Sequence, residues 1–88
     1  MIYIGIDIAK RGHLASAVGE DGKAVVESFR FNNTAGGFSK FLAKLKKAGA
    51  DAERSLIGME ATGHYWIALF DFLGAHGYAA PVITPIQS

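Results

Sequence analysis

The first residues of the chain alternate between apolar and polar or small side chains. Four isoleucines, at positions 2, 4, 6 and 8, are separated by Tyr3, Gly5 and Asp7. A period of two is typical of a β-strand with one apolar face. The pattern therefore predicts a first strand whose opposite face carries Asp7, close to the end of the strand.

Two further strands are predicted directly after the first. Residues 10–12 (Lys-Arg-Gly) favour a turn, and residues 13–19 fit a second strand. Asp21 and Gly22 are a strong hairpin signal that leads into a third strand over residues 23–31. The three strands are expected to form an antiparallel meander.

The rest of the chain alternates between helix and strand patterns. Residues 32–34 (Asn-Asn-Thr) can cap a helix that Gly49 ends, and the apolar run over residues 55–59 fits a buried strand. Thr62 is expected to cap a second helix, and residues 78–83 to form a fifth strand. The apolar stripes of the two helices are Phe38, Phe41, Leu42, Leu45 and Ala48 in the first, and Trp66, Leu69, Phe70 and Leu73 in the second.

The element order is β-β-β-α-β-α-β, which predicts an α/β fold with one mixed sheet. A strand-helix-strand unit crosses over with a right hand, so the fourth and fifth strands are expected to be parallel. In this order the fourth strand is expected beside the first. We interpret residues 1–88 as one domain, and the strand-like segment over residues 79–86 leads us to expect a domain truncated on its C-terminal side.

Composition narrows the kinds of site and partner. The sequence contains nine Lys and Arg residues and eight Asp and Glu residues, and the resulting net charge of +1 gives no overall electrostatic field that attracts nucleic acid. The sequence contains no cysteine, so any metal must be held by oxygen or imidazole. No signal peptide follows Met1 and no apolar run is long enough to cross a bilayer, so a cytoplasmic protein without membrane contact is expected.

Asp7 and Glu60 are the residues most able to carry chemistry. Each ends a largely apolar strand, where a carboxylate costs desolvation energy unless a cation or hydrogen bonds offset it. Carboxylates on neighbouring strands can share hard cations such as Mg²⁺. Each acid also has a structural explanation that stays open: Asp7 could cap the turn over residues 10–12, and Glu60 could favour the dipole of the helix that begins at Thr62.

Other polar residues are weaker candidates. His13 and His64 could contact a metal or a phosphate, but a single histidine is more often without such a role. Lys10 and Arg11 could meet a phosphate backbone or simply be solvated in their turn. Four lysines crowd the first helix, where charge on the outer face is ordinary: Lys40, Lys44, Lys46 and Lys47.

Three pieces of the sequence resemble the N-terminal region of the insertion-sequence 110 family of transposases, which includes the Piv-like invertases. They are residues 3–10 (YIGIDIAK), residues 59–66 (MEATGHYW), and Gly77 and Tyr78 followed by residues 82–88 (VITPIQS). The first piece is shared with many ribonuclease-H-like proteins and actin-like kinases, whereas the second, at its distance from Asp7, is much more specific. Thr84 departs from the asparagine that the family commonly has there.

The resemblance implies a RuvC-like, ribonuclease-H-like domain with four acids in the order Asp, Glu, Asp, Asp (DEDD) that bind two Mg²⁺ or Mn²⁺ ions. Asp7 and Glu60 match the first two acids. The other two, and a serine of a separate C-terminal domain, are expected beyond Ser88, so residues 1–88 are expected to be inactive alone. The implied activity is DNA strand cleavage and transfer in transposition, within a bacterial or archaeal cell. Implied partners are DNA and a structured noncoding RNA; further copies of the protein are also expected, because an exposed edge strand could pair between chains.

Two alternatives come from other functional classes. The meander and the Gly-Ile-Asp start also fit the N-terminal half of an actin-like, ATP-dependent sugar kinase, but the turn over residues 9–12 lacks the hydroxyl residue that such a phosphate site needs. A non-catalytic association module is the second alternative, because an exposed edge strand could pair between chains.

Overall fold

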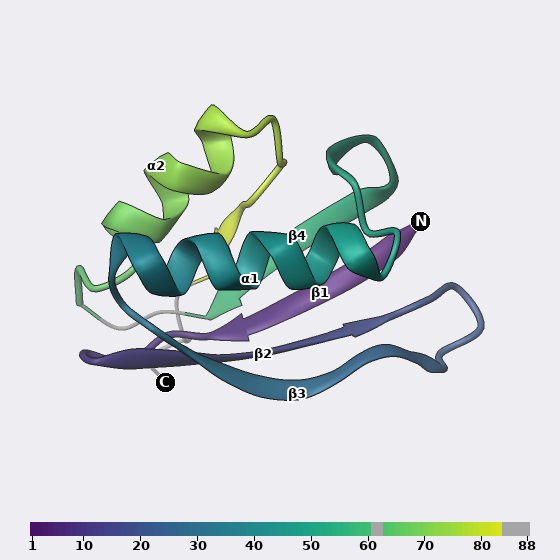
Figure 1. The fold of residues 1–88 in the computed structure, drawn as a ribbon, viewed down its shortest axis with the longest axis horizontal. Coiled ribbons are helices and arrows are strands. Elements are labelled where there is room, and N and C mark those ends of the chain that lie inside the picture. The colour runs from purple at the N-terminus through teal and green to yellow at the C-terminus, as the bar shows by residue number, and fades with distance from the viewer. Residues whose placement is uncertain (61–62, 84–88) are drawn as a thin grey trace.

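The computed structural model describes residues 1–60 and 63–83, which fold into one sheet with two α-helices (Figure 1). The strands are β1 (Ile2–Asp7), β2 (Gly12–Val18), β3 (Ala24–Asn32), β4 (Ser55–Glu60) and β5 (Val82–Ile83). The helices are α1 (Ala35–Lys47) and α2 (Ile67–Ala75), and a short 3-10 helix, η1 (Ala52–Arg54), precedes β4. The predicted order of strands and helices is confirmed.

The strands form one mixed sheet in the order β3-β2-β1-β4-β5. β2 is antiparallel to both β1 and β3, whereas β4 is parallel to both β1 and β5. The register of β1 with β4 runs without interruption from Ile2 opposite Ser55 to Asp7 opposite Glu60. The predicted meander, the place of the fourth strand beside the first, and the parallel fourth and fifth strands are all confirmed.

Both helices cover the same face of the sheet. The chain passes from β3 to β4 through α1 and from β4 to β5 through α2, so both connections move in one direction across the sheet. Two right-handed crossovers in one direction place their helices on one side. Phe38 of α1 and Phe72 of α2 accordingly contact each other, with ring centroids 5.5 Å apart.

The hydrophobic core lies between this face and the helices. Every second strand residue points into it, which accounts for the alternating burial of β1, β2 and β4. Phe31 of β3 stacks on Phe41 of α1 with centroids 4.4 Å apart, and this pair joins the first helix to the edge strand. Other buried side chains are Ile4, Ile6, Ala15, Ala17, Val26, Ile57 and Met59 from the strands and Leu42, Leu45, Leu69 and Leu73 from the helices.

No helix among the described residues covers the opposite face of the sheet, which we call the open face. Tyr3 is 47% exposed and Leu56 38% exposed there, although both are large and apolar. Alternation and register place the following residues on the open face: Tyr3, Gly5, Asp7, Leu14, Ser16, Val18, Leu56, Gly58 and Glu60. The two candidate acids therefore share a face with few buried side chains.

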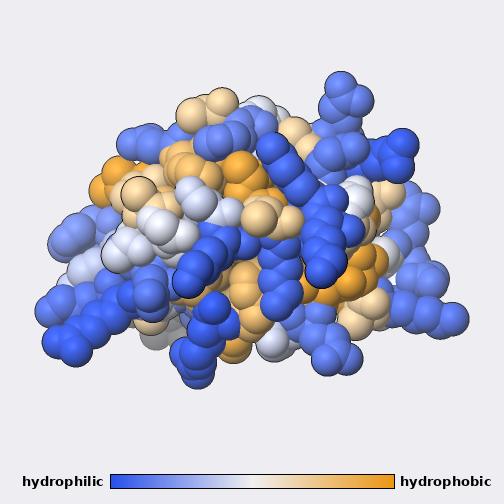
Figure 2. Space-filling model, in the orientation of Figure 1, coloured by the Kyte–Doolittle hydropathy of each residue, from blue (hydrophilic) through white to orange (hydrophobic). Residues whose placement is uncertain are grey.

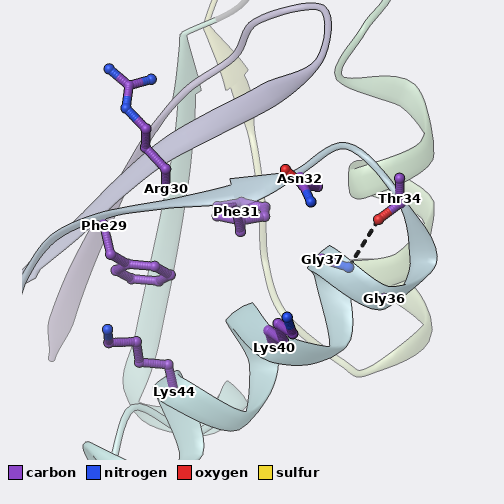
Figure 3. A pocket seen from close by; sticks show the side chains of 9 residues that line it. All are labelled: Phe29, Arg30, Phe31, Asn32, Thr34, Gly36, Gly37, Lys40 and Lys44. Atoms are coloured by element: carbon purple, nitrogen blue, oxygen red, sulfur yellow. Dashed lines mark hydrogen bonds between the residues drawn. The ribbon is translucent and has the colours of Figure 1, made fainter.

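Helix α1 begins with a side-chain cap and a close backbone approach. The Thr34 hydroxyl accepts a hydrogen bond from the Gly37 amide at 3.0 Å (Figure 3). Gly37 is buried against the backbone of Asn32, and a Cβ atom at this position would overlap the Asn32 carbonyl oxygen. Gly36, its neighbour, faces open space except for the Thr34 hydroxyl oxygen at 4.0 Å. The predicted cap is confirmed, and Gly37 sets how closely α1 meets β3.

The second helix differs from the prediction. It begins at Ile67 with Trp66 at its N-cap, and Thr62, the predicted cap, lies outside the described residues. Leu69 and Leu73 are buried as expected, but Phe70 is 39% exposed and Trp66 only half-buried. The Trp66 indole donates to the Gly63 carbonyl at 3.0 Å and packs edge to face with Phe70 at 5.5 Å. These two aromatic residues pair at the edge of the core: Trp66 is partly buried and packs against the core, whereas Phe70 is exposed although it belongs to the predicted apolar stripe.

The fifth strand is shorter than predicted. Ala79 forms an isolated parallel bridge with Leu56, and regular pairing resumes only at Val82 and Ile83. Between α2 and this bridge, Tyr78 is buried and its hydroxyl donates to the Ala50 carbonyl at 2.7 Å. This hydrogen bond ties the end of α2 to the segment before β4.

No helix in residues 1–60 and 63–83 combines the length and apolar character that crossing a membrane requires.

His13 is a polar side chain within the core. It is 1% exposed, and its ring packs on Phe31 and Phe38 with centroids at 5.3 and 6.4 Å. Nδ1 accepts a hydrogen bond from the Ala9 amide at 3.2 Å. Burial lowers the pKa of His13, and the side chain of Asn33 opposes this shift to a smaller extent. The folded protein therefore favours the neutral imidazole.

Adding a methyl group at Gly37 is expected to destabilise the fold, whereas the same change at Gly36 is not. Gly37→Ala should lower the free energy of unfolding by about 1–3 kcal/mol, because α1 must move away from the Asn32 carbonyl. Gly36→Ala should raise it by up to about 1 kcal/mol, since alanine favours the helix and meets no close atom. Urea denaturation of both variants measures the difference, and equal stabilities would contradict the close approach.

Stability should fall in mild acid because of His13. Its folded-state pKa lies below the unfolded value, so the unfolded chain binds the proton more tightly and the contribution is lost as pH falls below about 6.5. His13→Phe removes the titrating group and keeps an aromatic ring beside Phe31 and Phe38. Melting temperatures at pH 5, 6 and 7 should fall less steeply for this variant than for the wild type. Parallel slopes would show that His13 does not titrate on unfolding.

Candidate active site

Asp7 and Glu60 lie side by side at the ends of β1 and β4. They are the last pair in the parallel register, and neighbouring strands are about 4.8 Å apart. Both side chains are exposed and point to the open face. The Ile8 amide donates to the Glu60 carbonyl at 3.2 Å, so the strands remain joined immediately past the acids. The structure thus brings together the two predicted metal ligands.

A hollow of about 430 Å³ opens beside the two acids on the open face. Small residues form much of its lining: Gly5, Ser16, Ser28 and Gly58. The pairs Gly5 with Gly58 and Gly5 with Ser16 are register partners across three adjacent strands, so no large side chain fills the space between them. The hollow leaves room for a ligand or a further chain segment next to the carboxylates.

The structural explanations for the two acids do not match their positions. Hydrogen bonds from Ala9 to His13 and from the Asn33 side chain to the Lys10 carbonyl hold the turn after β1. The turn thus has anchors other than Asp7. Glu60 lies seven positions before the first residue of α2 at Ile67, and so outside the first turn, where the helix dipole acts.

The donor set fits a divalent cation. Carboxylate oxygens are the ligands that Mg²⁺ and Mn²⁺ prefer. The salt bridges between described residues join Met1 to Glu20 and Arg54 to Asp51, so none of them neutralises the acid pair. Within the same part of the chain, no group of three or more metal-ligating side chains forms. Asp7 and Glu60 therefore have the chemistry of part of a metal site, which further ligands would have to complete.

Lys10, Arg11 and His64 lie on two segments that follow the acids. Lys10 and Arg11 are exposed in the turn after β1, and His64 is exposed in the segment after β4. The Asn33 side chain donates to the carbonyls of Lys10 at 3.2 Å and Tyr65 at 3.5 Å, so the two segments are adjacent. The three residues predicted to contact nucleic acid are thus grouped at the acidic end of the sheet.

The remaining candidates lie elsewhere. His13 points into the core, on the opposite face from the acids, so the idea that it contacts a metal or phosphate is wrong. A second hollow of about 420 Å³ lies between β3 and α1, where Lys40 and Lys44 line it and the Arg30 side chain points away from the helix (Figure 3). The Lys44 ammonium lies 4.5 Å from the centroid of the Phe29 ring. Hydrophilic residues dominate this side of the molecule (Figure 2).

Two features of the site were not predicted from the sequence. Asn33 was assigned only a capping role, yet its side chain joins the segments after β1 and β4. Ser28 lines the hollow because it alternates with Phe29 and Phe31, which pack on the helix side, so that it lies on the open face. The hydrogen bonds of Asn33 have no periodic signal, since they depend on the folded sheet, whereas the alternation of Ser28 with two phenylalanines is visible in the sequence.

Comparisons with known proteins give a family and a fold class for this chain. The family model for the DEDD transposases of insertion sequence 110 matches residues 4–88. No curated protein matches the chain. The family match supports the transposase interpretation over the sugar-kinase one.

Solved structures show the fold class. Pelota of Archaeoglobus fulgidus is 17% identical with a TM-score of 0.60, over 99% of this chain and 28% of that chain. The Holliday junction resolvase of fowlpox virus is 12% identical with a TM-score of 0.59, over 100% of this chain and 64% of that chain. The resolvase has a ribonuclease-H-like fold, and the predicted ribonuclease-H-like α/β class is confirmed. The chain therefore spans less than two thirds of the length of either neighbour. By the family match over residues 4–88, it belongs to the insertion-sequence 110 family of DEDD transposases.

Proposed function

We propose that this chain supplies the first two acidic ligands of a divalent-metal site in a DNA transposase that cleaves DNA strands and transfers them during transposition. The observation that carries the proposal is the pairing of Asp7 with Glu60 at adjacent strand ends on the open face. Family membership supports the substrate class. Residues 1–88 are the N-terminal portion of the catalytic domain in this proposal, and acids from outside them complete the site.

Asp7 and Glu60 would hold Mg²⁺ or Mn²⁺, two ions in the complete site. Bound ions of this kind stabilise the attacking and leaving oxygens of a phosphoryl transfer. Two neighbouring carboxylates repel each other, and a cation between them relieves that repulsion. The exposure of both side chains leaves their oxygens accessible to a ligand. The adjoining hollow, lined by Gly5, Ser16 and Gly58, offers space for the sugar-phosphate backbone.

DNA is the proposed substrate and partner. Lys10, Arg11 and His64 are exposed beside the acidic end of the sheet, where cationic side chains can contact phosphates and position a strand. A structured noncoding RNA and further copies of the protein are proposed as the other partners, in the cytoplasm of a bacterial or archaeal cell. The RNA is proposed through the resemblance to the transposase family, and the further copies through pairing at an edge strand such as β3.

Removing one negative charge from the acid pair should abolish recombination without unfolding the protein. In the full-length transposase, Asp7→Asn and Glu60→Gln keep side-chain shape and weaken binding of a hard cation. Strand transfer in Mg²⁺ should fall at least about 100-fold. The melting temperature without metal should stay equal or rise slightly, because one of two adjacent like charges is gone.

Asp71→Asn and Glu53→Gln are matched controls, since both residues are exposed and lie outside the hollow. Both controls should retain strand transfer. A lower melting temperature with preserved strand transfer in Asp7→Asn and Glu60→Gln would refute the metal-site proposal.

Replacing the two basic side chains after β1 should weaken binding to DNA of any base sequence. A double Lys10→Ala, Arg11→Ala variant of the full-length protein should show a slope of log affinity against log salt that is shallower by about 1–2. Lys23→Ala is the control, because Lys23 is exposed near the β2–β3 hairpin at the other end of the strands. An unchanged slope in the double variant would show that these residues do not meet phosphates.

A further inference from the structure

One side chain links the two segments that leave the acid pair. Asn33, between β3 and α1, uses its Nδ2 group to donate to the carbonyls of Lys10 at 3.2 Å and Tyr65 at 3.5 Å. Its backbone amide donates to the Arg11 carbonyl at 3.0 Å. Asn33 therefore holds the turn that follows Asp7 and, through Tyr65, the segment that follows Glu60.

The hydrogen bonds fix how Asn33 and His13 are oriented. Because the Ala9 amide donates to Nδ1 of His13, the neutral ring must carry its proton on Nε2. Because Nδ2 of Asn33 donates to two carbonyls, the oxygen Oδ1 is left as an acceptor. The two side chains thus present a donor and an acceptor of matching type, and they hold consecutive residues of one turn, Ala9 and Lys10.

Burial makes this polar pair costly to disturb. Nε2 of His13 and Oδ1 of Asn33 are both buried, and among the described residues neither has a hydrogen-bond partner within bonding distance. A polar group that is buried without a complement destabilises the fold. Phe31 and Phe38 flank the His13 ring and hold its plane. We call His13 and Asn33, with their bonds to Ala9, Lys10 and Tyr65, the polar clasp.

We propose that the polar clasp positions the acid pair for ion binding, an inference that rests on the proposed function. Asp7 and Glu60 are the last register pair of β1 and β4, and strand ends are the first part of a sheet to open. The clasp fastens Ala9, two residues past Asp7, and Tyr65, five residues past Glu60. Releasing it lets the strand ends separate, so the distance between the carboxylates varies. His13 and Asn33 are positioning residues, since their side chains act through the backbone beside the acids.

Mn²⁺ binding to the full-length transposase, followed by electron paramagnetic resonance without DNA, tests the polar clasp. Asn33→Ala and His13→Phe should weaken Mn²⁺ affinity at least about tenfold, the effect expected when a ligand loses its support. Asn32→Ala is the matched control, because Asn32 is the exposed neighbour and precedes α1. Val26→Ala controls for lost stability, since Val26 is buried in β3 opposite Ala17 and away from the clasp. Both controls should bind Mn²⁺ as the wild type does.

The outcomes separate this inference from the proposed function. If folded Asn33→Ala and His13→Phe proteins bind Mn²⁺ like the wild type while Asp7→Asn does not, the positioning role is refuted and the metal site stands. If Asp7→Asn also binds like the wild type, both proposals fail. If Val26→Ala loses affinity to the same degree as the clasp variants, the effect is one of general stability and the positioning role is refuted. Should Asn33→Ala not fold, His13→Phe decides alone, because it keeps the aromatic packing.

Discussion

The parallel pairing of β1 with β4 is the constraint on which the rest of the structure depends. Six consecutive residue pairs join these strands, from Ile2 with Ser55 to Asp7 with Glu60. Side chains alternate between faces, so a slip of one residue would move one acid to the helix side of the sheet. The core prevents this slip, because Ile4 and Ile57 are register partners and both are buried beneath the helices. Packing on one face therefore fixes the chemistry on the other.

Much of the fold can be predicted from the sequence, because the patterns that indicate each strand and helix lie within a few neighbouring residues. Alternating isoleucines define β1, Thr34 marks the start of α1, and the order of elements places Glu60 beside Asp7. Local patterns could not predict which residues of α2 are exposed. An apolar stripe indicates which side chains of a helix favour burial. How much of the stripe the sheet covers depends on where the helix begins, and Trp66, at the N-cap of α2, is only partly buried.

The polar contacts near the site are harder still to predict. Asn33 reaches Lys10 and Tyr65, which are 23 and 32 positions away, and no local pattern reports such a bond. His13 illustrates the same limit from the other side of the sheet. Its alternation with Ala15 and Ala17 matches the buried face, yet a histidine among small apolar residues suits burial only when Ala9 supplies a donor. The acids avoid this requirement because they are exposed to water, where their charge needs no internal partner.

The distance along the chain between Asp7 and Glu60 has a consequence for the order of folding. The β1–β2–β3 meander pairs neighbouring segments, whereas β4 pairs with β1 across more than 50 residues of chain that include α1. Long-range pairings of this kind are slow relative to local ones because the chain must first be closed. Without this pairing, Asp7 and Glu60 are single carboxylates, which are weak ligands for a hard ion. On the proposed function, affinity for the metal therefore depends on a long-range contact that no local segment of the chain can supply.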